Sequence, residues 1–415
     1  MTTATDPDEQ LRVAHQRYGD RRPNSARLAL EAAEVMPGGN TRSVLHFDPF
    51  PMRIEHADGA TIVDVDGISY IDLLGNYTAG LLGHSPEAIR TAIVDQLDRG
   101  WAIGATHPLE IELAELVCER FASIEQVRFT NSGTEANLMA IGAATHHTGR
   151  TRVVVFEEGY HGGVLSFAHG VGALNVPFDV GVLPYNDVAA LTRFFESDGG
   201  EIACVLVEPM QGSGGCVVAT PEFLDAVRAL TVATGAVLIF DEVMTSRLAW
   251  GGAQERFDVR PDMTTLGKYL AGGMTFGAFG GSRSIMSAFD PARGGALTQA
   301  GTFNNNVVTM AAGVATMRDV LTPRALTTLN DRGDLLRERL GDLFAAHSSP
   351  LSVTGIGSLM NIHAPDAVVQ ELLFHAMLDA GYYLAPRGMI ALSFAVTDAD
   401  LDGFCTALDD WHAHV

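Results

Sequence analysis

The sequence contains a single lysine. Lys268 stands in TTLGKYLAGG, and every other member of the 27 lysines and arginines is an arginine. Codon bias, or a salt-adapted acidic surface, would replace lysine by arginine wherever only positive charge matters. A guanidinium does not lose its proton in proteins, whereas an amine can lose its proton and attack a carbonyl carbon. Lys268 is therefore either a chance survivor or a nucleophile, and the other residues of the chain must decide between the two.

An acidic side chain follows the apolar run VLIF. Asp241 is expected at the carboxyl end of a buried strand, which is where ligands bind in open α/β sheets. A buried carboxylate is costly without a positive partner, and a protonated pyridine nitrogen would be such a partner. The structural alternative is that Asp241 caps the next turn, although its neighbour Glu242 is the better candidate for that role.

A third feature is the turn in QVRFTNSGTEAN. Ser132, Gly133 and Thr134 join a strand to a helix, so amide and hydroxyl donors at a positive helix end can hold a phosphate. Taken alone this is an ordinary helix start. Together with Asp241 and Lys268, it describes what pyridoxal phosphate needs, namely an anchor, a partner for the ring nitrogen and a lysine for the carbonyl.

An aromatic pair could flank such a cofactor. Tyr160 and His161 lie in EEGYHGG after the strand RVVVF, and Tyr160 would offer an aromatic face to the cofactor ring. A tyrosine in a loop is more often a surface packing residue.

These side chains require a sheet that places strand ends together. Short apolar runs alternate with amphipathic stretches of helical length, which predicts an α/β fold with a mainly parallel sheet and right-handed crossovers. The strand candidates are 126–130, 152–156, 202–208, 236–242 and 276–282, and the helix candidates are 109–121, 134–147 and 221–234.

The flanking segments have other patterns. Residues 24–36 read as a helix, 53–74 as a small antiparallel meander and 303–345 as helical, while two strand candidates after Leu351 suggest a smaller C-terminal α/β domain. We expect an N-terminal segment with the substrate loop at 1–55, a large cofactor domain at 56–302 and a small domain at 303–415.

Composition restricts the partners. Fifty acids against 27 bases give a formal charge of -23, which repels nucleic acids and anionic membranes. The four cysteines form no CxxC pair, so neither a disulfide framework nor a metal site is expected. The N-terminus lacks a basic, apolar leader pattern, and we expect a cytoplasmic enzyme.

The motifs, in this order, resemble those of class III pyridoxal phosphate aminotransferases of fold type I, especially the branch with glutamate semialdehyde aminomutase and the β-amino acid aminotransferases. The matching motifs are PGGNTRS, GNYTAGLLGHSPEAI, FTNSGTEAN, EEGYHGG, VEPMQGSGG, FDEVMTSRL, LGKYLAGG and GTFNNN. The resemblance implies a seven-stranded sheet with helices on both faces and a homodimer with shared active sites.

The same resemblance assigns roles to residues. It implies that Lys268 attaches to the cofactor, that Asp241 pairs with the pyridine nitrogen and that Val243 packs under the ring. Ser132, Gly133 and Thr134 would surround the phosphate, Tyr160 would stack on the ring, Glu208 would lie behind it, and Thr302 would reach the phosphate of the other subunit.

Departures from the family narrow the substrate. Ser213 stands where ω-aminotransferases carry a glutamate, and Ala391 stands where they carry a gate arginine. PGGNTR places Arg42 three residues after the glycines, as in β-amino acid aminotransferases, where this arginine holds the substrate carboxylate. Arg387, in YYLAPRGMIALS, matches their second arginine, which engages 2-oxoglutarate. For either arginine, a solvated surface charge is the ordinary alternative.

The sequence therefore predicts an aminotransferase that moves the amino group of an aromatic β-amino acid, of the β-phenylalanine type, to 2-oxoglutarate. The alternatives are an aminomutase acting on glutamate semialdehyde, an amine transaminase that needs no substrate carboxylate, and a binding protein without activity. Apolar residues beside the Arg42 loop suggest a side-chain pocket, although they could equally be core: Val44, Leu45, Phe47 and Met52.

Overall fold

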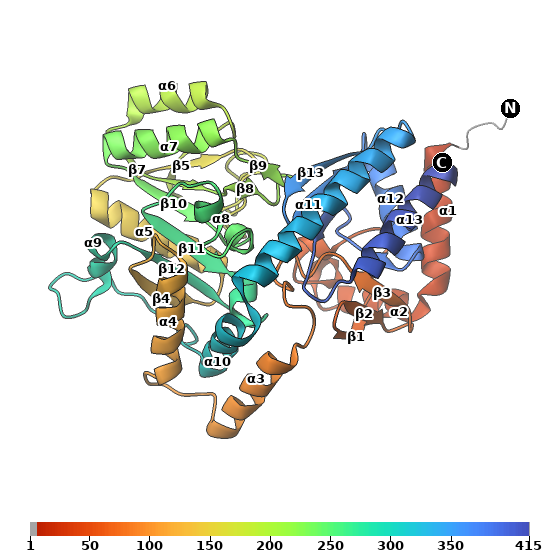
Figure 1. Cartoon of the computed structure of the whole chain (residues 1–415), viewed down its shortest axis with the longest axis horizontal. Coiled ribbons are helices and arrows are strands. Elements are labelled where there is room, and N and C mark those ends of the chain that lie inside the picture. Colours follow the sequence, from red (N-terminus) through yellow and green to blue (C-terminus); the bar gives the residue numbers. More distant parts are fainter. Residues whose placement is uncertain (1–5, 415) are drawn as a thin grey trace. The chain divides into compact units, whose positions relative to one another are not determined.

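The computed structural model describes residues 6–414, which group into two compact units. Unit 1 combines the chain up to Pro86 with the chain from Asp331, and unit 2 is the continuous stretch Glu87–Asn330. Figure 1 labels many of the helices and strands of both units. The predicted domain limits after residues 55 and 302 divide the chain differently, and that division stays a prediction.

Unit 2 is built on a seven-stranded sheet with the order β4-β12-β11-β10-β7-β5-β6. Its strands are β4 (Gln126–Thr130), β5 (Arg152–Phe156), β6 (Asp179–Leu183), β7 (Ile202–Val207), β10 (Val237–Asp241), β11 (Met263–Gly267) and β12 (Gly277–Gly281). The neighbours from β11 to β6 are parallel, and β12 runs antiparallel to both β11 and β4. The predicted α/β class and mainly parallel sheet are confirmed.

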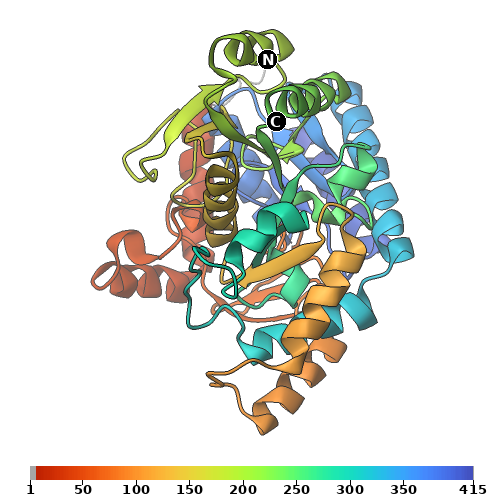
Figure 2. The same cartoon turned by 90° about the vertical axis from the view of Figure 1, so that its left-hand side faces the viewer.

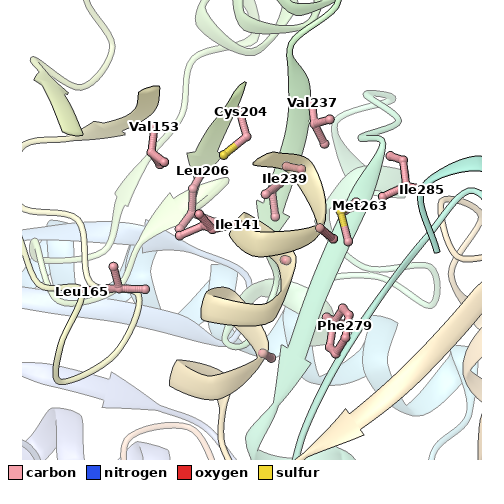
Figure 3. Close-up of a cluster of buried hydrophobic side chains, with 14 of the residues drawn as sticks. Ile141, Val153, Leu165, Cys204, Leu206, Val237, Ile239, Met263, Phe279 and Ile285 are labelled. Carbon is pink, nitrogen blue, oxygen red and sulfur yellow. The ribbon is translucent and has the colours of Figure 1, made fainter. Parts of the chain in front are cut away.

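Alternate side chains of the strands enter two different cores. Val153, Leu206 and Ile239 face helix α5 (Gly133–Thr148), whose Ile141 packs into the same cluster, as Figure 3 shows. Residues one position away, such as Val205 and Phe240, belong to the cluster on the opposite face. That face carries α6 (Val188–Asp198) and α7 (Pro221–Thr234). Successive side chains of a strand point to opposite faces, so these continuous apolar strands are buried by helices on both sides.

The other elements of unit 2 lie beside this sandwich. They are α3 (Glu87–Arg99), α4 (Pro108–Arg120), β8 (Met210–Gln211), β9 (Val217–Val218), η3 (Thr245–Arg247), α8 (Ala253–Arg256), η4 (Lys268–Ala271), α9 (Arg283–Met286), η5 (Ser287–Phe289), α10 (Val307–Ala315) and the π-helical η6 (Thr316–Val320). Helix α10 packs against both α3 and α4, which are the orange helices at the lower right of Figure 2.

Unit 1 contains two small sheets. One has the order β1-β2-β3-β15, from β1 (Ile54–Asp58), β2 (Thr61–Asp64), β3 (Ser69–Asp72) and β15 (Tyr382–Tyr383), and the other joins β13 (Ser352–Ile356), β14 (Leu359–His363) and β16 (Met389–Ala391). Its helices are α1 (Pro7–Arg21), α2 (Pro23–Ala33), α12 (Ala367–Asp379) and α13 (Asp398–His414), and α11 (Pro323–Ala346) contains the limit between the units.

Most local predictions agree with these bounds, and three need correction. The meander at 53–74 is confirmed as β1 to β3. The segment taken as a polar start forms α1, whose polar sequence buries only Ala14 and Tyr18. Strand β6 was missed because it lies at the sheet edge and is only partly buried. The first of the two strand candidates after Leu351 is a hairpin of β13 and β14. No helix among residues 6–414 is long and apolar enough to cross a membrane.

Candidate active site

The predicted phosphate turn is a capped helix start. Ser132 is the N-cap of α5, and its Oγ accepts a hydrogen bond of 3.2 Å from the Glu135 amide. The Glu135 carboxylate in turn accepts a hydrogen bond of 2.9 Å from the Asn131 amide. This reciprocal capping holds the turn open, and the first amides of α5, including those of Gly133 and Thr134, have no acceptor within the helix. They suit an anion.

Gly133 allows a close approach to the neighbouring loop. A Cβ added to Gly133 would lie 2.8 Å from Cγ2 of Val243, and one added to Gly267 would lie 3.3 Å from Cγ1 of the same valine. The phosphate turn, Val243 and the residue before Lys268 therefore meet at one place.

Asp241 is the last residue of β10 and is 4% exposed. Its Oδ2 forms hydrogen bonds of 2.8 Å with both Nδ2 of Asn137 and Nδ1 of His161. Its Oδ1 accepts a hydrogen bond of 3.0 Å from the Val243 amide. A carboxylate offers about four acceptor positions, so one position stays available for a further donor. Thr265 belongs to the same hydrogen-bond network, because its hydroxyl donates a hydrogen bond of 2.6 Å to Oδ1 of Asn137.

Two buried groups beside Asp241 have shifted pKa values. Burial by itself lowers the pKa of His161, but its hydrogen bond to Asp241 and the charges of Asp241 and Glu208 reverse this, so the net shift is upward. Burial raises the pKa of Glu208 to about 7, the charge of Asp241 adds to the rise, and His161 and two backbone amides oppose it. Positive charge on His161 is thus favoured between the two acids.

Glu242 has the structural role expected for it. Its carboxylate accepts hydrogen bonds from the amides of Ala253 at 2.6 Å and Gln254 at 3.0 Å, which lie in the first turn of α8. The two neighbouring acids therefore have different roles. Glu242 caps a helix, while Asp241 faces His161 and Asn137.

Lys268 follows β11, the parallel neighbour of β10. Asp241 is paired in register with Thr265, three residues before Lys268, so the acid and the amine lie at the same edge of the sheet. Lys268 is half-buried and has a φ of 55°, in the left-handed region that residues other than glycine rarely adopt. Such strain is found mainly at functional sites.

Two other predicted cofactor residues are exposed. Tyr160 lies in the loop after β5, is 47% exposed, and donates its amide to Oε2 of Glu208 at 2.9 Å. Thr302 is also exposed. Two residues after it, Oδ1 of Asn304 accepts a hydrogen bond of 2.9 Å from Nδ2 of Asn131, which lies beside the phosphate turn. The roles of Tyr160 and Thr302 stay predictions.

The two arginines predicted to bind substrate lie beside the same tyrosine ring in unit 1. The Cζ atoms of Arg42 and Arg387 lie 5.5 Å and 5.6 Å from the centre of the Tyr77 ring. Nη1 of Arg42 also donates a hydrogen bond of 2.7 Å to Oδ1 of Asn76, and the Tyr77 hydroxyl donates one of 2.9 Å to the Val44 carbonyl. Burial raises the pKa of Tyr77, and the charges of Arg387 and Arg42 oppose the rise.

The backbone beneath the arginines is strained. Asn76, Tyr77 and Thr78 have φ values of 47°, 53° and 78°, which are unusual for residues with side chains, above all for β-branched threonine. Each such residue costs of order 1–3 kcal/mol and persists only where its surroundings hold it. Phe47 and Met52, by contrast, pack in the core cluster of unit 1 rather than around an open pocket.

Sequence reasoning missed four residues of these networks: Asn76, Tyr77, Asn137 and Thr265. Three of them lie inside motifs already noted, Asn76 and Tyr77 in GNYTAG and Asn137 in FTNSGTEAN. Their partners are distant in sequence, and no local pattern shows such contacts.

Comparison with known proteins decides the family. The family model for class III aminotransferases matches residues 45–411. The chain belongs to the class III aminotransferases. It is 49% identical to a β-phenylalanine transaminase of Variovorax paradoxus over 97% of this chain and 95% of that protein.

Solved structures agree with this assignment. The crystal structure of a β-phenylalanine aminotransferase from the same organism superposes with a TM-score of 0.97 at 47% identity, covering 99% of this chain and 98% of that one. An ω-transaminase from Sphaerobacter thermophilus gives a TM-score of 0.88 at 36% identity, covering 94% and 97%. A glutamate-1-semialdehyde aminomutase from Pseudomonas aeruginosa, at 24% identity and a TM-score of 0.88 over 97% of both chains, shares the fold.

The aminotransferase uses pyridoxal 5′-phosphate as its cofactor, as its family does, and has the fold type I architecture. Its residues fit that group. The start of α5 offers amides to a phosphate, and Asp241 keeps an acceptor position for a protonated ring nitrogen. Lys268 provides the amine at the same sheet edge.

Proposed function

We propose that the aminotransferase transfers the amino group of an aromatic β-amino acid, of the β-phenylalanine type, to 2-oxoglutarate. The observation that carries the proposal is the placement of two guanidinium groups, Arg42 and Arg387, around the one ring of Tyr77. Donor and acceptor both carry carboxylates, and a guanidinium binds a carboxylate through two parallel hydrogen bonds. The β-phenylalanine transaminase relative supports the choice of donor.

The residues of unit 2 hold the cofactor and move the proton. Ser132, Gly133 and Thr134 bind its phosphate, while Val243, Tyr160 and Glu208 position its ring. Asp241, held by His161 and Asn137, keeps the ring nitrogen protonated. When bound, the cofactor acts as the electron sink for the bond that breaks at the amine-bearing carbon of the substrate.

Lys268 is the proton carrier. Its Nζ accepts the proton that leaves the amine-bearing carbon of the donor, and in the second half-reaction it acts as a general acid that delivers a proton to C2 of 2-oxoglutarate as glutamate forms. Arginine could not replace it, because a guanidinium does not take part in such a transfer at neutral pH.

The two arginines bind different substrates. Arg42 binds the carboxylate of the β-amino acid, and Arg387 binds the side-chain carboxylate of 2-oxoglutarate. Both must attract anions to a chain with a formal charge of -23, so local guanidinium groups have to overcome a general repulsion.

We also propose a homodimer in the cytoplasm, in which Thr302 contacts the phosphate in the other subunit. Thr302 is exposed, and large apolar side chains on unit 2 are exposed with it, including Phe303 at 67%, Ile111 at 64% and Trp101 at 58%. Exposed apolar residues of this size are typical of subunit interfaces. Four free cysteines are consistent with a reducing compartment.

The decisive experiment supplies purified enzyme with β-phenylalanine and 2-oxoglutarate and measures glutamate. We expect glutamate to form and the Lys268→Ala variant to lose both turnover and the absorbance of covalently bound cofactor. Arg42→Ala should raise the KM for β-phenylalanine by about 10- to 100-fold, since a charge-assisted hydrogen bond is worth roughly 1.5–3 kcal/mol. Arg27→Ala is the matched control, because Arg27 is exposed on α2 and pairs with Glu31.

Other outcomes identify the competing functions. Turnover of glutamate semialdehyde without glutamate formation from β-phenylalanine would assign an aminomutase. Turnover of amines without a carboxylate, unaffected by Arg42→Ala, would assign an amine transaminase, which the 36% identity to an ω-transaminase makes the second candidate. Arg387→Ala should impair 2-oxoglutarate more than pyruvate, since pyruvate has no side-chain carboxylate.

A further inference from the structure

Three side chains with metal-binding atoms meet between α1 and α12 in unit 1. His15 comes from α1, and Glu371 and His375 occupy one face of α12 four residues apart. Their ligand atoms all lie within 4.8 Å of one another. None of these residues belongs to the cofactor or substrate machinery proposed above.

The spacings fit a tetrahedral zinc ion. Nε2 of His15 lies 2.7 Å from Oε1 of Glu371, and the same oxygen lies 3.9 Å from Nε2 of His375. With zinc bonds of about 2.0–2.2 Å, neighbouring ligand atoms in a tetrahedral site are roughly 3.3–3.5 Å apart. The two distances lie on both sides of that value, and no ligand atom is more than 4.8 Å from another, so side-chain adjustments of up to roughly 1.5 Å would close the site.

The surroundings also suit a bound ion. The His375 side chain is 1% exposed, whereas those of His15 and Glu371 are 26% and 30% exposed, which leaves an entry path from solvent. Nε2 of His375 donates a hydrogen bond of 3.1 Å to the Asp48 carbonyl, so zinc binding at this nitrogen has to displace that bond. Two imidazoles with one carboxylate favour zinc over magnesium or calcium, which prefer oxygen ligands.

We propose that His15, Glu371 and His375 form a zinc site that joins α1 to α12. The metal is an added cross-link, because Arg17 and Arg21 of α1 already form ion pairs with Asp379 at the end of α12. The helices therefore stay packed without metal, and zinc binding adds to the stability of unit 1 by mass action.

The test is zinc binding to the untagged holoenzyme after removal of free cofactor and metal. Isothermal titration with zinc chloride should give one equivalent per chain, and cobalt should give the intense visible bands of a tetrahedral site. Zinc should also raise the Tm. His15→Ala and Glu371→Gln change partly exposed side chains, so circular dichroism should show both variants folded, and each should lower zinc affinity by at least about tenfold.

His347→Ala is the matched control. His347 pairs with Asp409 at 2.7 Å, the same distance as His15 and Glu371, but it is not one of the three clustered residues. Retained binding in His347→Ala, with loss in the other two variants, supports the site. Absence of stoichiometric zinc binding in the wild type would overturn it, as would binding and a Tm shift that His15→Ala and Glu371→Gln leave unchanged. Magnesium chloride should give no titration signal, and equal binding of magnesium would also contradict a zinc site.

Discussion

His161 and Asp241 form a buried hydrogen bond, with Nδ1 of the imidazole 2.8 Å from Oδ2 of the carboxylate and both side chains at most 4% exposed. Burial alone would lower the pKa of His161, but the hydrogen bond to Asp241 and the charges of Asp241 and Glu208 raise it. The hydrogen bond orients Asp241 from one side, while its Oδ1, which accepts from the Val243 amide, has room for a further donor. The pair connects the loop after β5 to the end of β10.

We predict that Asp241→Asn and His161→Gln lower kcat to different degrees. Loss of the carboxylate charge should reduce kcat by at least about 100-fold, in the range of general acid–base effects. His161→Gln should reduce it roughly tenfold, because it removes one charge-assisted hydrogen bond worth about 1.5 kcal/mol and leaves the acid in place. Steady-state kinetics with β-phenylalanine test this, with exposed His147→Gln on α5 as the control. Equal kcat in His161→Gln and wild type would show that the imidazole does not position Asp241.

Glu208 should make folding stability depend on pH. Its pKa is about 7 in the folded chain and about 4.3 in an unfolded chain, so between these values the folded state holds the extra proton. The contribution of Glu208 to the free energy of unfolding therefore falls as pH rises from about 4.3 to 7 and is constant above that range. In urea unfolding of the cofactor-free enzyme, the wild type should lose stability relative to Glu208→Gln between pH 5.5 and 7. A difference that is flat or grows with pH would contradict the prediction.

The sequence predicted the strand and turn framework because its signals are local. The runs around Val154 and Val205 are short and continuously apolar, and Ser132 stands directly before the helix it caps. Helix α1 was not predicted, because most of its side chains are polar and its packing depends on residues such as His375, more than 350 positions away. The meeting of Arg42 with Arg387 over Tyr77 likewise depends on long-range topology that no local pattern encodes.

Gly277 is predicted to be indispensable to the phosphate turn. A Cβ there would lie 2.1 Å from the Ser132 carbonyl oxygen and 2.4 Å from Oγ1 of Thr130, so Gly277→Ala must displace backbone. We expect a loss of about 1–3 kcal/mol in stability, the usual cost of overpacking, and weaker cofactor binding. Gly142→Ala on α5 is the control, since its Cβ meets nothing within 4 Å and should add roughly 0.5–1 kcal/mol. Urea unfolding and cofactor titration of both variants test this prediction. Tight cofactor binding by Gly277→Ala would refute the role of this contact.

Tyr77 should affect both substrates, because its ring contacts both arginines. Each cation–π contact is worth about 1 kcal/mol, so Tyr77→Ala should raise the KM for β-phenylalanine and for 2-oxoglutarate by about fivefold each. Tyr77→Phe keeps the ring and loses only the hydrogen bond to Val44, so its KM values should stay near those of the wild type. Pyruvate separates the two contacts, because without a side-chain carboxylate it should be less sensitive to Tyr77→Ala than 2-oxoglutarate. If Tyr77→Ala and Tyr77→Phe gave the same KM values, the ring would not hold the arginines, and their shared contact would be a packing feature without a role in substrate binding.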